Sequence, residues 1–160
     1  MVKKVRKIDS IPEESDVLNG FGSVDYVDTY AISVKTSLSA EEVSRELMSH
    51  DMPCWVRFLY RVRNLFVRVL GLEAVNRNEG TESVFTLIAQ NEHEVIMGKD
   101  DTHLNFRGAI LFDRESDTLS FITLVHFNNW RGRLYFLPVK PFHKLIVKSL
   151  LKKYLKRRCV

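Results

Sequence analysis

The sequence predicts an α+β domain in which a curved antiparallel sheet wraps around a long C-terminal helix, with two helices directly after the first strand. Three observations carry this prediction. The hydrophobic period changes from about 3.6 to about 2 after residue 80, short polar turns separate the segments that follow, and the chain ends in a long amphipathic segment. Residues 1–22 are expected to form an irregular lead-in, and residues 23–160 a single domain.

The composition is that of an ordinary globular protein. Of the 160 residues, 45% are hydrophobic and 28% are charged, and a chain of this length can bury a core without metal or disulfide bonds. No apolar run approaches the roughly 20 residues of a membrane span, and the N-terminus lacks the apolar part of a secretory signal. The formal charge of +4 is a mild excess. We expect a cytoplasmic protein with no membrane span.

The cysteines and histidines do not form a metal-binding pattern. Cys54 and Cys159 lie far apart, which favours a reducing compartment and disfavours a structural zinc site. The spacings between His103, His126 and His143 fit no common zinc motif. Neither a metal nor a cofactor is therefore expected.

The first strand is expected in the stretch VDYVDTYAISV, residues 24–34, because its apolar residues alternate. Asp28 is the only interruption on the apolar side of this strand. The other members of that side are Val24, Tyr26, Tyr30, Ile32 and Val34.

Two helices are expected next. Ser39 is a good N-cap residue and Glu42 can return the capping-box bond, so the first helix is predicted to begin at Ser39 and to run to about His50. The second, over residues 53–70, has an apolar stripe and an opposite arginine face, and Gly71 ends it. An arginine face of this kind either binds phosphates or is the solvated side of a packed helix.

Four further strands are predicted at residues 83–90, 94–99, 103–113 and 118–128, which makes five in total. Short turns between them indicate an antiparallel meander. The strand at 118–128 is apolar on both faces, so it is expected at the centre of the sheet.

The last segment, residues 139–157, predicts a long helix that lies across the sheet. Gly132 is expected to permit a turn before it. Six residues are expected to face the sheet: Val139, Phe142, Leu145, Ile146, Leu150 and Tyr154. The outer edge carries lysines at every fourth position, namely Lys140, Lys144, Lys148, Lys152 and Lys156. This element order is that of the helix-grip fold, in which an apolar cavity lies between sheet and helix.

Several fragments resemble a known family. They are MPCWVRFLYRVRNLFVRVLGL, GRLYF, KPFHKLIV, VDYVDTYAISV and HLNFRGAILF, and together they span the chain from about Val24 to its end. The family is domain of unknown function 2867, which is mostly bacterial and includes members fused behind short-chain-dehydrogenase-like domains. The resemblance implies a START-like (SRPBCC) helix-grip fold. It implies no activity and no catalytic residues, and the chain has no GxGxxG motif for a nicotinamide cofactor.

The residues that could bind a ligand are polar side chains expected near the cavity. His103, Asn105 and Arg107 share one face of a strand, and His126 joins them if the last two strands pair as a hairpin. Arg133 and Tyr135 are placed toward the cavity entrance, and His143 opens the last helix. A histidine there could move a proton and Arg107 could hold an anion, but on the solvated face of the sheet these residues would be ordinary exterior side chains.

Three functions follow from this reading. The first is a binding module for a small hydrophobic or amphipathic ligand. The second is a cyclase or isomerase-like enzyme that uses His126, Arg107 and His103 in the same cavity. The third is an interaction or peripheral surface protein that uses the basic helix faces. No nucleic acid partner is expected, and the sequence leaves the oligomeric state open.

Overall fold

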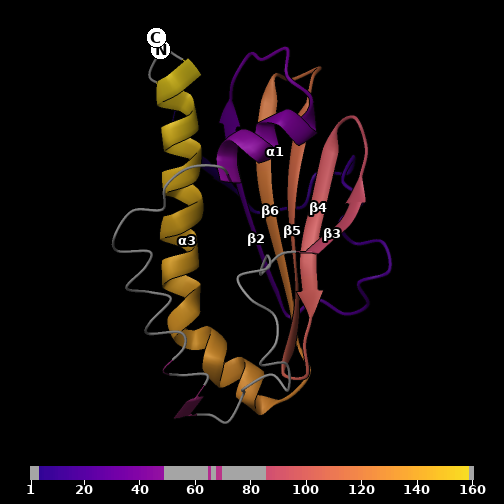
Figure 1. Ribbon diagram of the computed structural model, residues 1–160, viewed down its shortest axis with the longest axis vertical. Coiled ribbons are helices and arrows are strands. Elements are labelled where there is room, and N and C mark those ends of the chain that lie inside the picture. Colours follow the sequence, from indigo (N-terminus) through magenta and orange to yellow (C-terminus); the bar gives the residue numbers. More distant parts are fainter. Residues whose placement is uncertain (1–3, 49–64, 66–67, 70–85, 159–160) are drawn as a thin grey trace.

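A computed structural model of the chain describes residues 4–48, 65, 68–69 and 86–158 (Figure 1). Its elements are β1 (Arg6–Ile8), β2 (Tyr26–Ser33), α1 (Ala40–Met48), β3 (Thr86–Gln90), β4 (Glu94–Asp100), β5 (Leu104–Asp113), β6 (Thr118–Phe127) and α3 (Trp130–Arg158). The expected second helix and both cysteines lie almost entirely outside the described residues.

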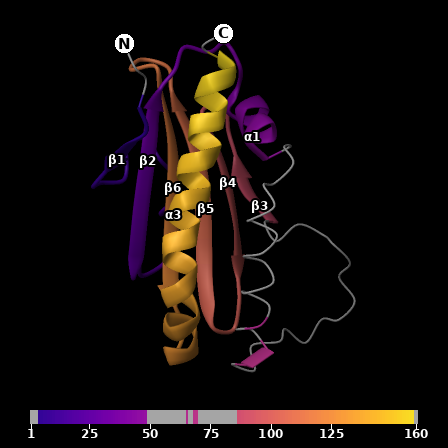
Figure 2. The ribbon, with the colours of Figure 1, turned by 90° about the vertical axis from the view of Figure 1, so that its left-hand side faces the viewer.

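The strands form one antiparallel sheet in the order β1-β2-β6-β5-β4-β3. This confirms the predicted α+β class, the curved antiparallel sheet, the meander from β3 to β6 and the long C-terminal helix. β6 lies between β2 and β5, so the strand that is apolar on both faces is indeed internal. Seen from the side of α3, the helix runs along the sheet in front of its middle strands (Figure 2).

The two faces of the sheet are covered by different parts of the chain. On one face, side chains of α1 and α3 pack against a cluster that includes Tyr30, Ile32, Ile110, Phe112, Leu119 and Phe121. On the opposite face, Val17 and Phe21 of the N-terminal segment cover Ile96, Ala109, Leu111, Ile122 and Leu124 (Figure 1). Both faces of the central strands are therefore buried, as their continuous apolar sequence predicts.

The N-terminal segment is more ordered than the expected irregular lead-in. Residues 6–8 form β1, a sixth strand that sequence reasoning missed because three residues are too few for a periodic signal. Glu94, which is 1% exposed, accepts hydrogen bonds from the Ser15 hydroxyl and from the Asp16 backbone N–H, the latter at 2.8 Å. The buried carboxylate thus holds the lead-in against the sheet.

The start of α1 follows the predicted capping box. The Ser39 N–H donates to Glu42 Oε2 at 2.8 Å, and the Glu42 N–H donates to Ser39 Oγ at 3.2 Å. The bond from the Ser39 backbone also lowers the pKa of the Glu42 carboxyl. Two otherwise unpaired N–H groups of the helix end are satisfied in this way.

The helix α3 begins at Trp130, well before the predicted start at residue 139. Asn129 caps it, because its Oδ1 accepts a hydrogen bond from the Gly132 N–H at 3.2 Å. Gly132 is therefore part of the first helical turn, and the prediction of a turn between strand and helix there was wrong. Pro138 and Pro141 lie inside the helix, which bends near them (Figure 1).

Val139 and Leu150 of α3 pack against the core as predicted, but one residue of the predicted side does not. Leu145, expected to face the sheet, is 53% exposed, whereas Val147 and Leu151 are at most 1% exposed. Tyr154 is buried as predicted, with Leu155 beside it. The helix is apolar on more than one side, so its period alone could not select the side that packs.

Gly132 is required for the close approach of α3 to the turn before β5. A Cβ atom at this position would lie 2.0 Å from the backbone oxygen of His103, far closer than two non-bonded atoms can approach. At Gly108 a Cβ atom would have its nearest neighbours at 3.9 Å, an ordinary contact.

We therefore predict that Gly132→Ala lowers the free energy of unfolding by about 2–3 kcal/mol, because the clash outweighs the better helix propensity of alanine. Gly108→Ala is the control and should change it by less than about 1 kcal/mol. Urea denaturation followed by circular dichroism measures both. Equal stabilities for the two variants would contradict the close approach.

Candidate functional site

A group of buried and half-buried polar side chains lies between the sheet and α3, beside apolar core residues. It consists of Asp28 with Tyr26 and Tyr30 on β2, Thr123 on β6 and His143 on α3, and we call it the Asp28 cluster. Asp28 is 3% exposed, and it lies directly opposite Thr123 in the register of β2 and β6. Alternation along the two strands points these side chains toward α3.

The Asp28 carboxylate is only partly satisfied by its neighbours. Its Oδ2 accepts a hydrogen bond from the Tyr26 hydroxyl at 2.9 Å. Its Oδ1 is buried and accepts no hydrogen bond of ordinary geometry from a described residue. The Tyr30 hydroxyl also interacts with the Asp28 carboxylate, and this interaction contributes to the raised pKa of Tyr30. An incompletely satisfied buried carboxylate oxygen is costly, so a further donor at Oδ1 would stabilise it.

Thr123 links the sheet to α3 through His143. The Thr123 hydroxyl and His143 Nε2 are 2.9 Å apart, and they form a hydrogen bond whose direction depends on the tautomer of the ring. Next to Thr123 on β5 is Gly108, which has no side chain to fill the layer between sheet and helix.

The cluster combines one carboxylate with cations and with uncharged groups. Lys140 Nζ lies 4.9 Å from the centroid of the Tyr26 ring and Lys148 Nζ lies 5.1 Å from that of Tyr30, so these two lysines do not lie on the outer edge of α3 as predicted. Burial lowers the pKa of His143 below its ordinary value of 6.5, the Asp28 charge partly opposes this shift, and Lys144 adds to it. Burial and the nearby Asp28 charge raise the pKa of Tyr30 to about 12. Burial and the bond to Asp28 also raise the pKa of Tyr26. At neutral pH the cluster presents phenols, a hydroxyl and a neutral imidazole.

Aromatic side chains adjoin the cluster at its end nearer the start of α3. The ring of Phe136 on α3 lies 4.9 Å from that of Tyr26 and 5.4 Å from that of Phe127, measured between centroids. The same apolar group includes Leu104, Phe106, Val125, Tyr135 and Val139. A polar centre beside an aromatic surface is the composition typical of small-molecule sites.

Of the seven candidate residues from the sequence, only His143 belongs to the Asp28 cluster. Arg107 lies on the opposite face of the sheet, where it donates to the Asn19 carbonyl at 2.8 Å and stacks over the Phe21 ring. His126 lies on that face too, since it is paired with Asn105 in the hairpin of β5 and β6. The predicted hairpin register is confirmed, but it turns these three side chains away from α3.

His126 has polar neighbours that at first resemble a catalytic triad. Its Nδ1 lies 2.9 Å from Asp25 Oδ2 and 3.0 Å from Ser23 Oγ. A triad requires the carboxylate and the nucleophile on different ring nitrogens, and here both use Nδ1. The Phe127 N–H lowers the pKa of Asp25, with His126 adding to the effect, so the arrangement ties residues 23–25 to β6.

The other candidates hold the beginning of α3 in place. The rings of His103 and Tyr135 meet edge to face at 5.3 Å, and both residues are buried. Asn105 accepts a hydrogen bond from the side chain of Asn128 at 2.8 Å. Arg133 lies over the ring of Phe127 and is largely exposed.

The sequence did contain a signal for the residues that were missed. Asp28 is the one charged residue on the apolar side of β2, and Thr123 is the polar residue within the apolar side of β6. A polar residue on the core-facing side of a strand is the informative exception. The cross-strand register that brings the two together, and the position of His143 over them, were not visible in the sequence.

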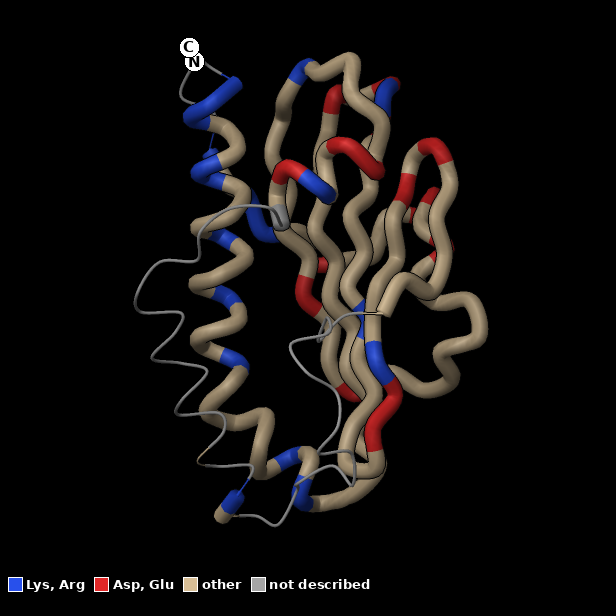
Figure 3. Tube along the Cα trace, in the orientation of Figure 1, with Lys and Arg blue, Asp and Glu red and all other residues tan. Residues whose placement is uncertain are grey.

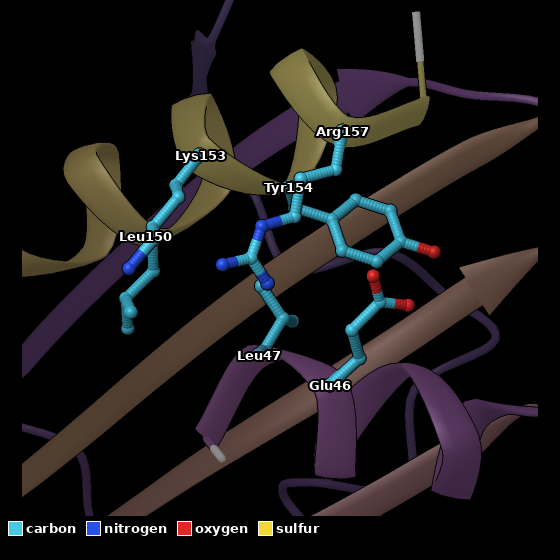
Figure 4. A pocket seen from close by; sticks show the side chains of 6 residues that line it. All are labelled: Glu46, Leu47, Leu150, Lys153, Tyr154 and Arg157. Carbon is cyan, nitrogen blue, oxygen red and sulfur yellow. The ribbon is translucent and has the colours of Figure 1, made fainter. Parts of the chain in front are cut away.

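A small pocket lies farther along α3, beside α1 (Figure 4). Its volume is about 10 Å³, and it is lined by Glu46, Leu47, Leu150, Lys153, Tyr154 and Arg157. This volume suits a single water molecule and no larger ligand. Among the described residues, no group of three His, Cys, Asp or Glu side chains is placed to hold a metal ion.

Comparison with known proteins gives one match. A family model described as "Protein of unknown function (DUF2867)" matches residues 21–150. The chain belongs to this family. The match covers β2 to β6 and most of α3, which includes every residue of the Asp28 cluster. Searches of curated proteins and of solved structures found no match.

The lowered pKa of His143 predicts a pH dependence of stability. The unfolded chain protonates this histidine near its ordinary value of 6.5, whereas the folded protein does so only at lower pH. The contribution of neutral His143 to the free energy of unfolding is therefore fully present above that pH and is lost as the pH falls below it. His143→Gln should remove this part of the loss between about pH 7.5 and about pH 5.5.

Urea denaturation at a series of pH values measures the effect. The exposed His93 serves as the control, since His93→Gln should leave the pH dependence of the wild type in place. If the free energy of unfolding changed with pH equally in wild type and His143→Gln, His143 would not be the group responsible.

Proposed function

We propose that this chain is a cytoplasmic ligand-binding module of the helix-grip (START-like) kind, which holds a small hydrophobic or amphipathic molecule between its sheet and α3. A hydrogen-bond donor of the ligand, such as a hydroxyl or an amine, binds Asp28. The apolar part of the ligand lies along the aromatic side chains near Tyr26 and Phe136.

One observation carries this proposal: Asp28 Oδ1 is buried and accepts no hydrogen bond of ordinary geometry from a described residue. Burial of a carboxylate that lacks a full set of hydrogen bonds costs roughly several kcal/mol. A fold retains such a group where it serves binding or chemistry. Thr123 and His143 supply a hydroxyl and an imidazole beside it, which can fix the orientation of a bound polar group.

The enzyme alternative based on His126, Arg107 and His103 has less support. Arg107 and His126 pack on the face of the sheet that α3 does not cover, so they cannot act together with a group between sheet and helix. A proton transfer inside this layer would have to use Asp28 and His143 instead. The binding proposal needs only the hydrogen bonds that these groups can make.

The first test is native mass spectrometry of the purified protein, followed by denaturing extraction of what it releases. We expect an adduct of small-molecule mass in the wild type and its loss in Asp28→Asn and in Thr123→Val, which keep the side-chain shapes. His126→Gln, on the other face of the sheet, is the matched control and should keep the adduct.

Circular dichroism must show that the variants are folded. An adduct retained by Asp28→Asn and Thr123→Val would contradict the proposed site. A wild-type protein that is empty and gains no thermal stability from any of a panel of hydrophobic amines and alcohols would contradict the proposed function.

A further inference from the structure

The outer side of α3 carries an exposed apolar stripe. Trp130 is 65% exposed, Leu134 40%, Leu137 67% and Leu145 53%. With the exposed Pro141 these residues recur at intervals of four, three, four and four, which places them on one side of the helix. We call these five residues the α3 stripe. It lies on the part of the helix that precedes the packed residues Val147 and Leu151.

The same helix carries a strong excess of positive charge. It contains ten of the 24 lysines and arginines of the chain and no Asp or Glu. The remainder of the chain therefore has 14 cationic residues against 20 carboxylates, so the charge of the protein is divided between α3 and the rest. Figure 3 shows Lys and Arg along α3, while Asp and Glu lie on the sheet, its loops and α1.

The cations flank and continue the stripe. Arg131 lies over the ring of Trp130, with 5.6 Å between the guanidinium carbon and the ring centroid. Lys144 precedes Leu145, and Lys152 and Lys156 continue the row beyond it, whereas Lys148 Nζ lies 5.1 Å from the centroid of the Tyr30 ring. A tryptophan and leucines in one row with lysines and arginines beside it are the composition of helices that lie in the interface of an anionic membrane.

We propose that α3 is a docking surface for an anionic lipid bilayer. The stripe inserts Trp130, Leu134 and Leu137 into the headgroup region, and the flanking cations bind the lipid phosphates and carboxylates. None of the described helices is long and apolar enough to cross a membrane, so the contact is peripheral.

Charge distinguishes this partner from the other occupants of an apolar stripe. A second copy that docked through the same helix would place two helices of ten cations each against one another, which is repulsive. A nucleic acid would satisfy the cations but would leave the leucines and Trp130 without an apolar environment. An anionic bilayer complements both parts of the surface.

Sedimentation with vesicles tests the proposal. We expect the wild type to bind vesicles of phosphatidylcholine with about 30 mol% phosphatidylserine at low salt, to bind pure phosphatidylcholine far more weakly, and to be released by about 0.5 M NaCl. The double variant Leu134→Gln/Leu137→Gln should reduce the partition coefficient at least about tenfold.

The matched control is Leu87→Gln/Ile88→Gln on β3. It also replaces two exposed apolar side chains, 56% and 43% exposed, but at the edge of the sheet. This control should bind as the wild type does. Both double variants change exposed positions, and circular dichroism verifies that they fold.

Four results would overturn the proposal. They are no binding to the anionic vesicles at low salt, equal binding by the Leu134→Gln/Leu137→Gln variant, equal binding to pure phosphatidylcholine, and a dimer in sedimentation velocity that this variant dissociates. The last result would assign the stripe to a second copy of the chain. None of these results depends on the ligand proposed for the Asp28 cluster.

Discussion

The packing of the second half of α3 on the sheet is the interaction on which the other features of the structure depend. Val147, Leu151 and Leu155 enter a cluster with Ile110, Phe112 and Leu119, and each such side chain contributes about 1.5–3 kcal/mol when it is fully buried. This contact determines which edge of the helix faces inward. It also decides that Asp28, Thr123 and His143 are interior residues, although an aspartate and a histidine are ordinarily found at the surface.

In the first part of α3, one side of the helix has exposed apolar residues, among them Trp130 and Leu137. Pro138 and Pro141 bend the helix between the two parts, and Gly132 lets its first turn approach the backbone of His103. The inner side of this part carries Tyr135 and Phe136 toward the sheet, while Trp130 and Leu137 remain outside. One helix thus closes the layer that contains the Asp28 cluster and presents a basic, apolar surface to its surroundings. A module that takes an amphipathic molecule from a membrane needs both properties.

Features that depend on residues close together in the chain were predicted from the sequence more accurately than features that depend on distant contacts. The capping box of Ser39 and Glu42 and the alternation along β5 and β6 depend on near neighbours in the chain, and both were predicted. The start of α3 was missed because Pro138 and Pro141 are typical helix breakers. In the structure the helix begins before them, with Asn129 as its cap and Gly132 against the backbone of His103.

The candidate site was less predictable than the fold. The residues on each side of β5 and β6 were sorted correctly, but both sides are apolar, so the pattern could not tell which one faces α3. For that reason the sequence left open whether Arg107 and His126 line the cavity or lie on the other face, and the structure has them on the face away from α3. Asp28 was visible as a charged interruption of a strand, yet its partners Thr123 and His143 come from distant segments that only the folded sheet and helix bring together.

The most direct test of the account is a crystal structure of the protein as purified, at a resolution that shows ordered water, with attention to the density beside Asp28 Oδ1. We expect an elongated feature that is not protein, with one polar end within hydrogen-bond distance of Asp28 and the rest along Phe136 and Phe127. A space filled by protein side chains, or by isolated waters alone that complete the bonds of Asp28, would contradict it, and the cluster would then be a structural network of the core.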